Sequence, residues 1–159
     1  MNVDLFAEGM RMLASGVTIV TTEHEGIKSG LTATAVCSLS AEPARLLTCI
    51  NKSGESYKMI SESRIFCINI LAFDQVELAK CFAGLTYNSL EDRFTLGTWT
   101  NLKSGAPVLE GSLASFDCRA NTILDSGSHG IIIGDILDIS INKGAKPLLY
   151  MDGGFKTII

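Results

Sequence analysis

The alternation of apolar and polar positions predicts a chain built mostly from short strands. Apolar residues recur at helical spacing near the start and predict a helix over residues 3–14, at Val3, Phe6, Met10 and Leu13. Apolar and β-branched runs predict strands at residues 17–22, 30–40, 46–50, 64–71, 113–122, 130–141, 147–151 and 155–159. Ser53, and Asp74 with Glu77, are suited to cap two further helices that end near residues 61 and 82.

The order of these elements predicts an antiparallel barrel, mainly β with a few helices. The strands follow one another without the strand–helix–strand rhythm of a parallel sheet. No repeat, linker or low-complexity stretch divides the sequence, so we expect residues 1–159 to form one domain. Residues 84–106 mix Gly, Thr, Asn and charges around the only tryptophan, Trp99. This segment is predicted to be an extended loop that packs over the rest.

The most informative segment is the run at residues 30–40. In a regular strand one face would carry hydroxyls and the other small side chains, namely Thr32, Thr34, Ser38 and Ser40 against Ala33, Ala35 and Cys37. Small side chains leave room for a flat ring beside the backbone, and hydroxyls can hold a sugar-alcohol chain or phosphate oxygens. An ordinary half-buried strand would show the same pattern, so this run alone does not establish a ligand.

The segment Asn51, Lys52 and Ser53 follows a predicted strand and opens a predicted helix. A helix N-terminus presents N–H groups and partial positive charge, which suit a phosphate. Lys52 adds a full charge and Ser53 a hydroxyl, although a solvated lysine and a plain cap explain each residue taken singly. With the hydroxyl run close by, the segment suggests one phosphate-bearing ligand. The phosphate-loop pattern GxxxxGK[ST] is absent, so nucleotide hydrolysis has no support.

His129 lies in a loop of small residues before an apolar strand. A histidine there can hydrogen-bond a substrate or shuttle a proton, but a surface histidine in a turn fits the sequence equally well. The sequence carries no nucleophile motif and no acid–base pair. A ligand site without such groups suggests that a cofactor carries the chemistry.

Composition narrows the class of protein. Thirteen basic and seventeen acidic residues give a net charge of −4 with no Lys/Arg cluster, which argues against a nucleic-acid partner.

No apolar run approaches the ~18 residues of a membrane span and no signal peptide is evident, so we expect a cytoplasmic protein without membrane contact. Charged residues make up 19%, below the usual ~25%, which predicts a homodimer that hides part of its surface. Five scattered cysteines and two distant histidines predict no metal site.

Several segments, taken in order, resemble the short-chain flavin reductases. They are residues 30–38, 49–51, 81–84, 91–94 through Trp99, 107–109, 111–115 and 127–129. The resemblance covers nearly the whole chain. It is nearest to the reductase components of two-component flavin-dependent monooxygenases, such as that of 4-hydroxyphenylacetate 3-monooxygenase. One departure is the first helix, where these relatives often carry an arginine at the position of Ala7 and this chain has Arg11 instead.

This resemblance implies a split β-barrel, a homodimer and a flavin cofactor, FMN or FAD. It implies that the flavin phosphate lies near Asn51, Lys52 and Ser53, and that the flavin ring is flanked by Thr32, Ala33, Thr34 and Ala35. It also places Ser38 toward the ribityl-phosphate end and His129, the candidate catalytic residue, near the nicotinamide. Three further residues belong to motifs that the resemblance assigns to the cofactor site: Phe82, Arg93 and Phe94. For Phe82, packing in the core is an alternative.

The function implied is an NAD(P)H:flavin oxidoreductase that supplies reduced flavin to a partner oxygenase. An alternative is a flavoprotein that holds FMN tightly and passes electrons to a protein partner, because the flavin site would look the same. A barrel without a ligand is a third hypothesis. The sequence leaves open FMN or FAD, NADH or NADPH, and the identity of the oxygenase.

Overall fold

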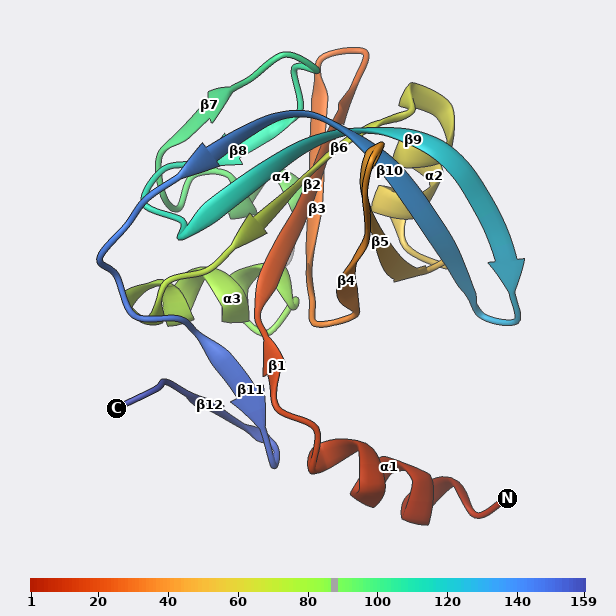
Figure 1. The fold of residues 1–159 in the computed structure, drawn as a ribbon, viewed down its shortest axis with the longest axis vertical. Coiled ribbons are helices and arrows are strands. Elements are labelled where there is room, and N and C mark those ends of the chain that lie inside the picture. The colour runs from red at the N-terminus through yellow and green to blue at the C-terminus, as the bar shows by residue number, and fades with distance from the viewer. Residues whose placement is uncertain (87–88) are drawn as a thin grey trace.

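A seven-stranded sheet, antiparallel throughout, forms the body of the molecule (Figure 1). The structure is a computed structural model that describes residues 1–86 and 89–159. The sheet has the order β3-β2-β6-β9-β10-β5-β4, with bounds β2 (Thr18–His24), β3 (Ile27–Ala33), β4 (Val36–Ala41), β5 (Ala44–Asn51), β6 (Ile65–Ile70), β9 (Ala114–Ser126) and β10 (His129–Ile141). Its edge strands β3 and β4 are consecutive in sequence but do not pair with each other within the described residues, so the barrel is split along one side. The predicted mainly β, split antiparallel barrel is confirmed.

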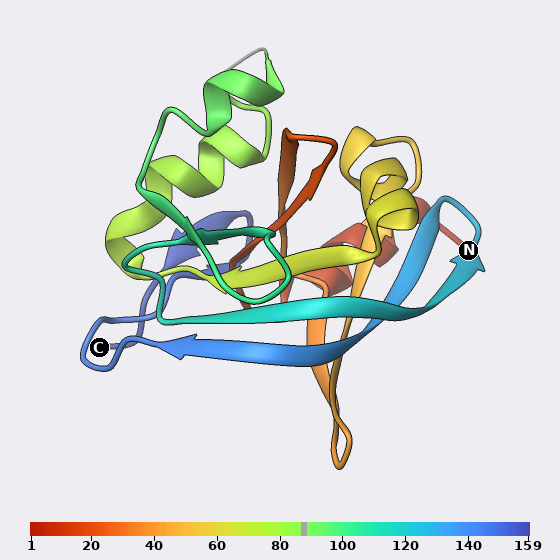
Figure 2. The same cartoon turned by 90° about the horizontal axis from the view of Figure 1, so that it is seen from above.

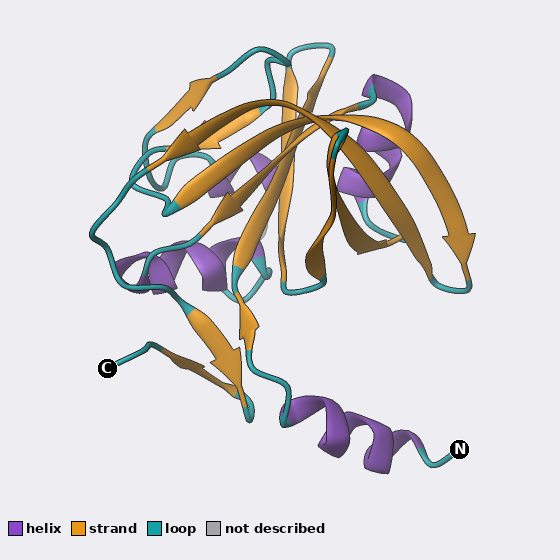
Figure 3. Cartoon of the chain, in the orientation of Figure 1, coloured by secondary structure: helices purple, strands orange, loops and turns teal. Residues whose placement is uncertain are grey.

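Smaller elements surround this sheet (Figure 3). One small sheet has the order β1-β11-β12, and another pairs β7 with β8. The bounds of these elements are β1 (Ser15–Gly16), β7 (Trp99–Asn101), β8 (Pro107–Leu109), β11 (Leu149–Met151), β12 (Gly154–Lys156), α1 (Val3–Arg11), α2 (Glu55–Ser63), α3 (Val76–Phe82) and α4 (Leu90–Arg93). Helices α3 and α4 lie together against β3, whereas α2 packs on β2 and β3 (Figure 2). None of the helices in the described ranges has the length and apolar stretch that a membrane span requires.

Three apolar clusters fill the described part of the molecule: one inside the barrel, one between the sheet and α3, and a smaller one formed by Cys67, Ala106 and Val108. Strand β6 contributes Phe66 and Ile68 to the barrel cluster and Cys67 to the smaller one, because successive side chains of a strand point to opposite faces. The buried Asn69 amide ties this interior together. Its Nδ2 donates to the Ile19 carbonyl at 3.2 Å, and its Oδ1 accepts from the Leu109 amide and the Ser115 hydroxyl, each at 2.9 Å. Because its donor and acceptor atoms are paired in this way, the Asn69 side chain joins β6 to β2, β8 and β9 at one point.

The predicted single strand at residues 30–40 is wrong, because the chain forms β3 and β4 with a break at Thr34 and Ala35. Strand β3 pairs with β2 at one edge of the sheet, and β4 pairs with β5 at the other edge. The chain must therefore cross the open side of the barrel between them. A regular strand cannot make that crossing, since its direction and its hydrogen-bond partners both change there.

Two predicted helix caps are also wrong. Ser53 does not cap α2, whose N-cap is Gly54 without a side-chain hydrogen bond. Ser53 instead gives both its amide and its hydroxyl to the Asn51 carboxamide oxygen, at 3.0 and 2.9 Å. Before α3, the Gln75 side chain accepts from the Ala72 amide at 3.0 Å, in place of the cap predicted from the acidic residue at position 74.

The segment at residues 84–106 is more ordered than the predicted loop, since it contains α4 and β7. Residues 87–88 of this segment lie outside the described residues. Trp99 does pack over the rest, as predicted. Its ring lies 5.4 Å from that of Phe82 and 4.9 Å from that of Phe94, measured between centroids.

Gly134 on β10 offers a test of the barrel packing. An added Cβ would lie 2.5 Å from the Phe66 ring and 3.1 Å from the Cys118 Cβ, inside the apolar cluster. We expect Gly134→Ala to lower the free energy of unfolding by about 1–3 kcal/mol in urea denaturation, because the core has no room for a methyl group. Gly16→Ala is the control, since nothing lies within 4 Å of a Cβ there. Equal effects of the two substitutions would contradict this packing.

Candidate functional site

The segment that crosses the open side of the barrel presents unpaired backbone donors. Thr34 and Ala35 are both exposed. Their carbonyls are engaged, since that of Thr34 accepts from the Val36 amide and that of Ala35 from the Cys49 amide, each at 3.0 Å. Within the described residues, the amides of Thr34 and Ala35 have no acceptor. Two neighbouring N–H groups at the surface can therefore donate to the polar edge of a ligand.

Only part of the predicted hydroxyl array is available for a ligand. The Thr32 hydroxyl donates to the Ala79 carbonyl of α3 and the Ser40 hydroxyl to the Pro43 carbonyl, each at 2.6 Å. Thr34 and Ser38 are exposed, and their hydroxyls have no partner within the described ranges. Thr32 therefore anchors β3 to α3, and any contact that it makes with a cofactor uses its backbone or its methyl group.

The predicted phosphate segment and the predicted histidine lie side by side. Strands β5 and β10 pair so that Asn51 stands opposite His129. The Lys52 amide donates to the Ser128 carbonyl at 2.9 Å, and the Lys52 Nζ lies 3.4 Å from an oxygen of Asp125. His129 is exposed, and its Nδ1 shares a 2.8 Å hydrogen bond with the Ser128 hydroxyl. A cation, a histidine and the start of a helix thus meet at one end of β5.

The crossing segment reaches the same end of β5. Ala35 accepts a hydrogen bond from Cys49, which stands two residues before Asn51 on that strand. Ser38 lies farther away, since it pairs with Leu46 toward the other end. The structure therefore brings together the crossing segment, the phosphate segment and His129, and leaves Ser38 apart from them. The role of each at a cofactor stays a prediction.

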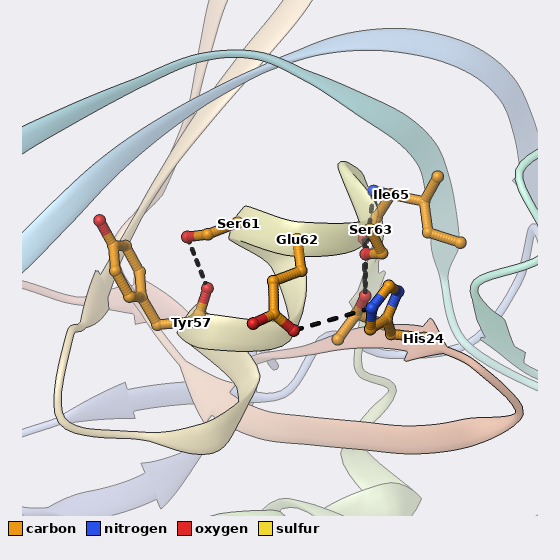
Figure 4. A network of polar contacts seen from close by, with 7 residues as sticks. His24, Tyr57, Ser61, Glu62, Ser63 and Ile65 are labelled. Carbon is orange, nitrogen blue, oxygen red and sulfur yellow. Dashed lines mark hydrogen bonds and ion pairs between the residues drawn. The ribbon is translucent and has the colours of Figure 1, made fainter.

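Helix α2, which follows the phosphate segment, is held in place by a network of polar contacts (Figure 4). On its outer side, Glu62 lies 3.7 Å from the His24 Nε2 of β2, and the Ser61 hydroxyl donates to the Tyr57 carbonyl at 2.8 Å. Tyr57 also abuts the β9–β10 hairpin so closely that a Cβ on Gly130 would lie 2.2 Å from its ring. The helix that follows the phosphate segment is thus fixed against both β2 and the hairpin that carries His129.

A cavity of about 360 Å³ lies over β3 beside the crossing segment. Its lining combines the predicted Thr32, Ala33 and Thr34 with residues from distant parts of the chain, which are Val17, Ala83, Leu85, Tyr150, Gly153 and Phe155. The volume falls within the roughly 300–1,000 Å³ of small-molecule sites. Two aromatic rings, those of Tyr150 and Phe155, stand 5.4 Å apart in an edge-to-face arrangement at this wall. Small side chains and aromatic rings give the cavity apolar walls that suit a flat ring.

Sequence reasoning missed Tyr150 and Phe155. They come from the β11–β12 hairpin, more than a hundred residues after β3. The only signal was an aromatic residue on each side of the predicted turn at residues 152–154. That signal shows a hairpin but does not show which strand the hairpin packs against.

Three residues assigned to the cofactor site by resemblance lie outside the lining of this cavity. Phe82 is 1% exposed and makes an edge-to-face contact with Phe94, with 5.1 Å between their centroids. The Arg93 Nη1 donates to the Gly30 carbonyl at 3.1 Å and to the Phe82 carbonyl at 3.4 Å. A Cβ on Gly30 would lie 2.9 Å from the Phe82 ring, so β3 is packed tightly on this aromatic cluster. In this structure Phe82, Arg93 and Phe94 support β3 from behind.

Three of the five thiols are unsuited to nucleophilic chemistry. Cys67, Cys81 and Cys118 are buried, whereas Cys49 is half-buried and Cys37 is exposed. Burial raises the pKa of Cys67 and Cys81, and it raises the pKa of Cys118 to about 12. These three thiols therefore stay protonated at neutral pH, and a protonated thiol is a poor nucleophile.

Comparison with known proteins agrees with this geometry. Residues 10–158 match the family model of the flavin reductase like domain. An FMN reductase (NADH) RutF of Agrobacterium fabrum is 39% identical over 96% of this chain and 87% of its own length. The flavin reductase PheA2 superposes with a TM-score of 0.91 at 31% identity, covering 100% of this chain and 99% of that one. Nitrilotriacetate monooxygenase component B from Mycobacterium thermoresistibile gives a TM-score of 0.92 at 31% identity, over 99% of this chain and 87% of that one. The family resemblance predicted from the sequence is thus confirmed, and the chain belongs to the family of flavin reductase like domains.

Proposed function

We propose that this protein is an NADH-dependent flavin reductase that reduces FMN by hydride transfer and supplies the reduced flavin to a partner oxygenase. The observation that carries the proposal is the pair of unpaired amides at Thr34 and Ala35 beside a 360 Å³ apolar cavity. The Agrobacterium relative is named for FMN and NADH, and the Mycobacterium structure is a component of a monooxygenase. FAD remains a candidate substrate of the same site.

The residues present fit a flavin in three respects. The amides of Thr34 and Ala35 can donate to the pyrimidine edge of its ring, where donors favour a ring that gains negative charge. The exposed Thr34 hydroxyl can reach the ribityl chain. Lys52 can hold the phosphate at the end of β5, and the Ser53 hydroxyl can join it only by giving up its hydrogen bond to the Asn51 carboxamide oxygen. When bound, the flavin supplies the ring that accepts a hydride, and the chain supplies the positions of the two reacting rings.

His129 is proposed to orient the nicotinamide. It stands at the mouth of β10 opposite Asn51, exposed, with its Nδ1 bound to Ser128. That hydrogen bond leaves Nε2 directed to solvent or to a ligand, so the ring can bind a carboxamide through this atom. Hydride transfer itself requires no proton from His129.

We further propose a homodimer of single-domain subunits that works in the cytoplasm. Helix α1 supports the dimer, because it has no buried residue and its first half exposes the apolar side chains of Val3, Leu5 and Phe6. Such an apolar surface on a helix is normally covered by another part of a protein. The proposed substrate NADH is a metabolite of the cytoplasm, which supports the location.

The proposed reaction is tested by turnover with NADH and NADPH against FMN and FAD in all combinations. We expect NADH oxidation that depends on added flavin, with flavin that exchanges freely. Stoichiometric yellow flavin that survives gel filtration without NADH turnover would instead support the electron-transfer flavoprotein. Absence of both turnover and flavin binding would contradict any flavin function.

The phosphate contact is tested with Lys52→Gln. We expect the KM for FMN to rise about tenfold, since a charged hydrogen bond contributes about 1.5–3 kcal/mol, while the KM for riboflavin, which lacks the phosphate, stays unchanged. Lys143→Gln, which removes the charge of an exposed lysine, is the control. An equal rise for FMN and riboflavin would show that Lys52 does not contact the phosphate.

The support of β3 is tested with Arg93→Met and Arg93→Lys. Methionine keeps the bulk of the side chain but removes the donors to the Gly30 and Phe82 carbonyls, so we expect the KM for FMN to rise several-fold while that for NADH changes little. Lysine can donate to one carbonyl and should restore part of the FMN affinity. A purely structural role predicts instead that both KM values stay constant while the melting temperature falls.

A further inference from the structure

Helix α1 and the small β1-β11-β12 sheet lie together at the foot of the barrel (Figure 1). A second cavity, of about 320 Å³, lies between them. Its lining residues are Ala7, Met10, Arg11, Leu13, Ser15, Thr34, Tyr150, Met151 and Asp152. Thr34 and Tyr150 also line the first cavity, so the two cavities adjoin at these residues. A ligand longer than the flavin ring could therefore extend from the first cavity into the second.

The charged groups of the two cavities are confined to the second one. Among the described lining residues, Arg11 is the only Lys or Arg and Asp152 is the only Asp or Glu. The Asp152 amide donates to the Arg11 carbonyl at 2.8 Å, which fixes the end of α1 to the β11–β12 turn. No ion pair joins the two side chains within residues 1–86 and 89–159. A cation and a carboxylate are thus held at one cavity, and neither neutralises the other.

We propose that the second cavity binds the adenosine diphosphate moiety that NADH and FAD share. The inference rests on the proposed function, because the flavin ring would occupy the first cavity and the nicotinamide would lie against that ring. Arg11 binds the pyrophosphate, since a guanidinium matches phosphate oxygens with paired donors. Asp152 accepts hydrogen bonds from the ribose hydroxyls, and Met10, Leu13 and Met151 form an apolar surface for the adenine.

The same arrangement sets the choice between the two nicotinamide dinucleotides. NADPH carries a phosphate on the adenosine ribose, where NADH has a hydroxyl. Beside Asp152 that phosphate would meet a like charge, which is unfavourable at short range. With one cation for the pyrophosphate and none beside the carboxylate, the cavity favours NADH over NADPH.

The test uses Arg11→Gln and Asp152→Asn, with FMN as the flavin so that only the nicotinamide dinucleotide carries the moiety. Asp152 has φ of 51°, a backbone conformation that asparagine tolerates, so this substitution introduces no strain. We expect Arg11→Gln to raise the KM for NADH about tenfold with the KM for FMN unchanged, as loss of a charged hydrogen bond implies. We expect Asp152→Asn to raise the NADPH-to-NADH ratio of kcat/KM about tenfold.

Controls and a second arm separate the sources of the moiety. Arg119→Gln and Asp74→Asn remove exposed charges outside both cavities and should change neither ratio. If Arg11→Gln raises the KM for FAD and leaves those for FMN and NADH unchanged, the cavity serves FAD. If Arg11→Gln leaves the KM values for NADH and FAD unchanged, the proposal is overturned. It is also overturned if light scattering shows that the variant has changed its oligomeric state, since that change would explain a higher KM.

A binding measurement keeps this inference distinct from the proposed function. Wild-type protein without any flavin-dependent turnover would refute the proposed function, and calorimetry with ADP-ribose then tests the cavity alone. Binding of ADP-ribose by the wild type and about tenfold weaker binding by Arg11→Gln would support the second cavity. No binding, or equal binding by both proteins, would overturn it.

Discussion

The structure depends on one topological constraint: two strands that are consecutive in sequence lie at opposite edges of the sheet. Because β3 pairs with β2 and β4 pairs with β5, the two residues between them must cross the open side of the barrel. Their amides leave the ladder and find no acceptor in the described part of the chain. An unpaired amide is tolerated only where solvent or a ligand can satisfy it. The split in the barrel therefore creates the edge at which we propose that the flavin binds.

Most of the surrounding structure serves to hold that edge in place. The Thr32 hydroxyl ties β3 to α3, and the Arg93 guanidinium ties β3 to α4 and to the end of α3. The aromatic cluster around Phe82 fills the space behind β3. The Phe82 ring lies so close to Gly30 that no side chain would fit at that position. On the other side, α2 and the β9–β10 hairpin fix the end of β5. A crossing segment held on both sides presents its N–H donors in one geometry. Binding a ligand therefore costs less conformational entropy than it would with a flexible segment.

The sequence predicted local features of the site well and their assembly poorly. The residue types at 30–40 drew attention to the segment that crosses between the two edge strands of the sheet. Thr32 was assigned a free hydroxyl because the pattern of one strand does not reveal that α3 places the Ala79 carbonyl against it. Tyr150 was missed because contacts between distant segments are set by tertiary packing, which periodicity does not report. Phe82 and Arg93 were placed near the cofactor by resemblance. In the structure both contact Gly30 of β3, so any effect on a cofactor would pass through the position of that strand.

The central claim is that the crossing segment binds the flavin through its backbone. Amide proton shifts in ¹⁵N-labelled protein report this directly, since an N–H that gains a hydrogen bond moves downfield and exchanges more slowly. On titration with FMN, we expect saturable downfield shifts and slowed exchange at Thr34 and Ala35, and the same two residues should respond to riboflavin. Saturable binding of FMN that leaves both amides unshifted would contradict backbone binding of the flavin.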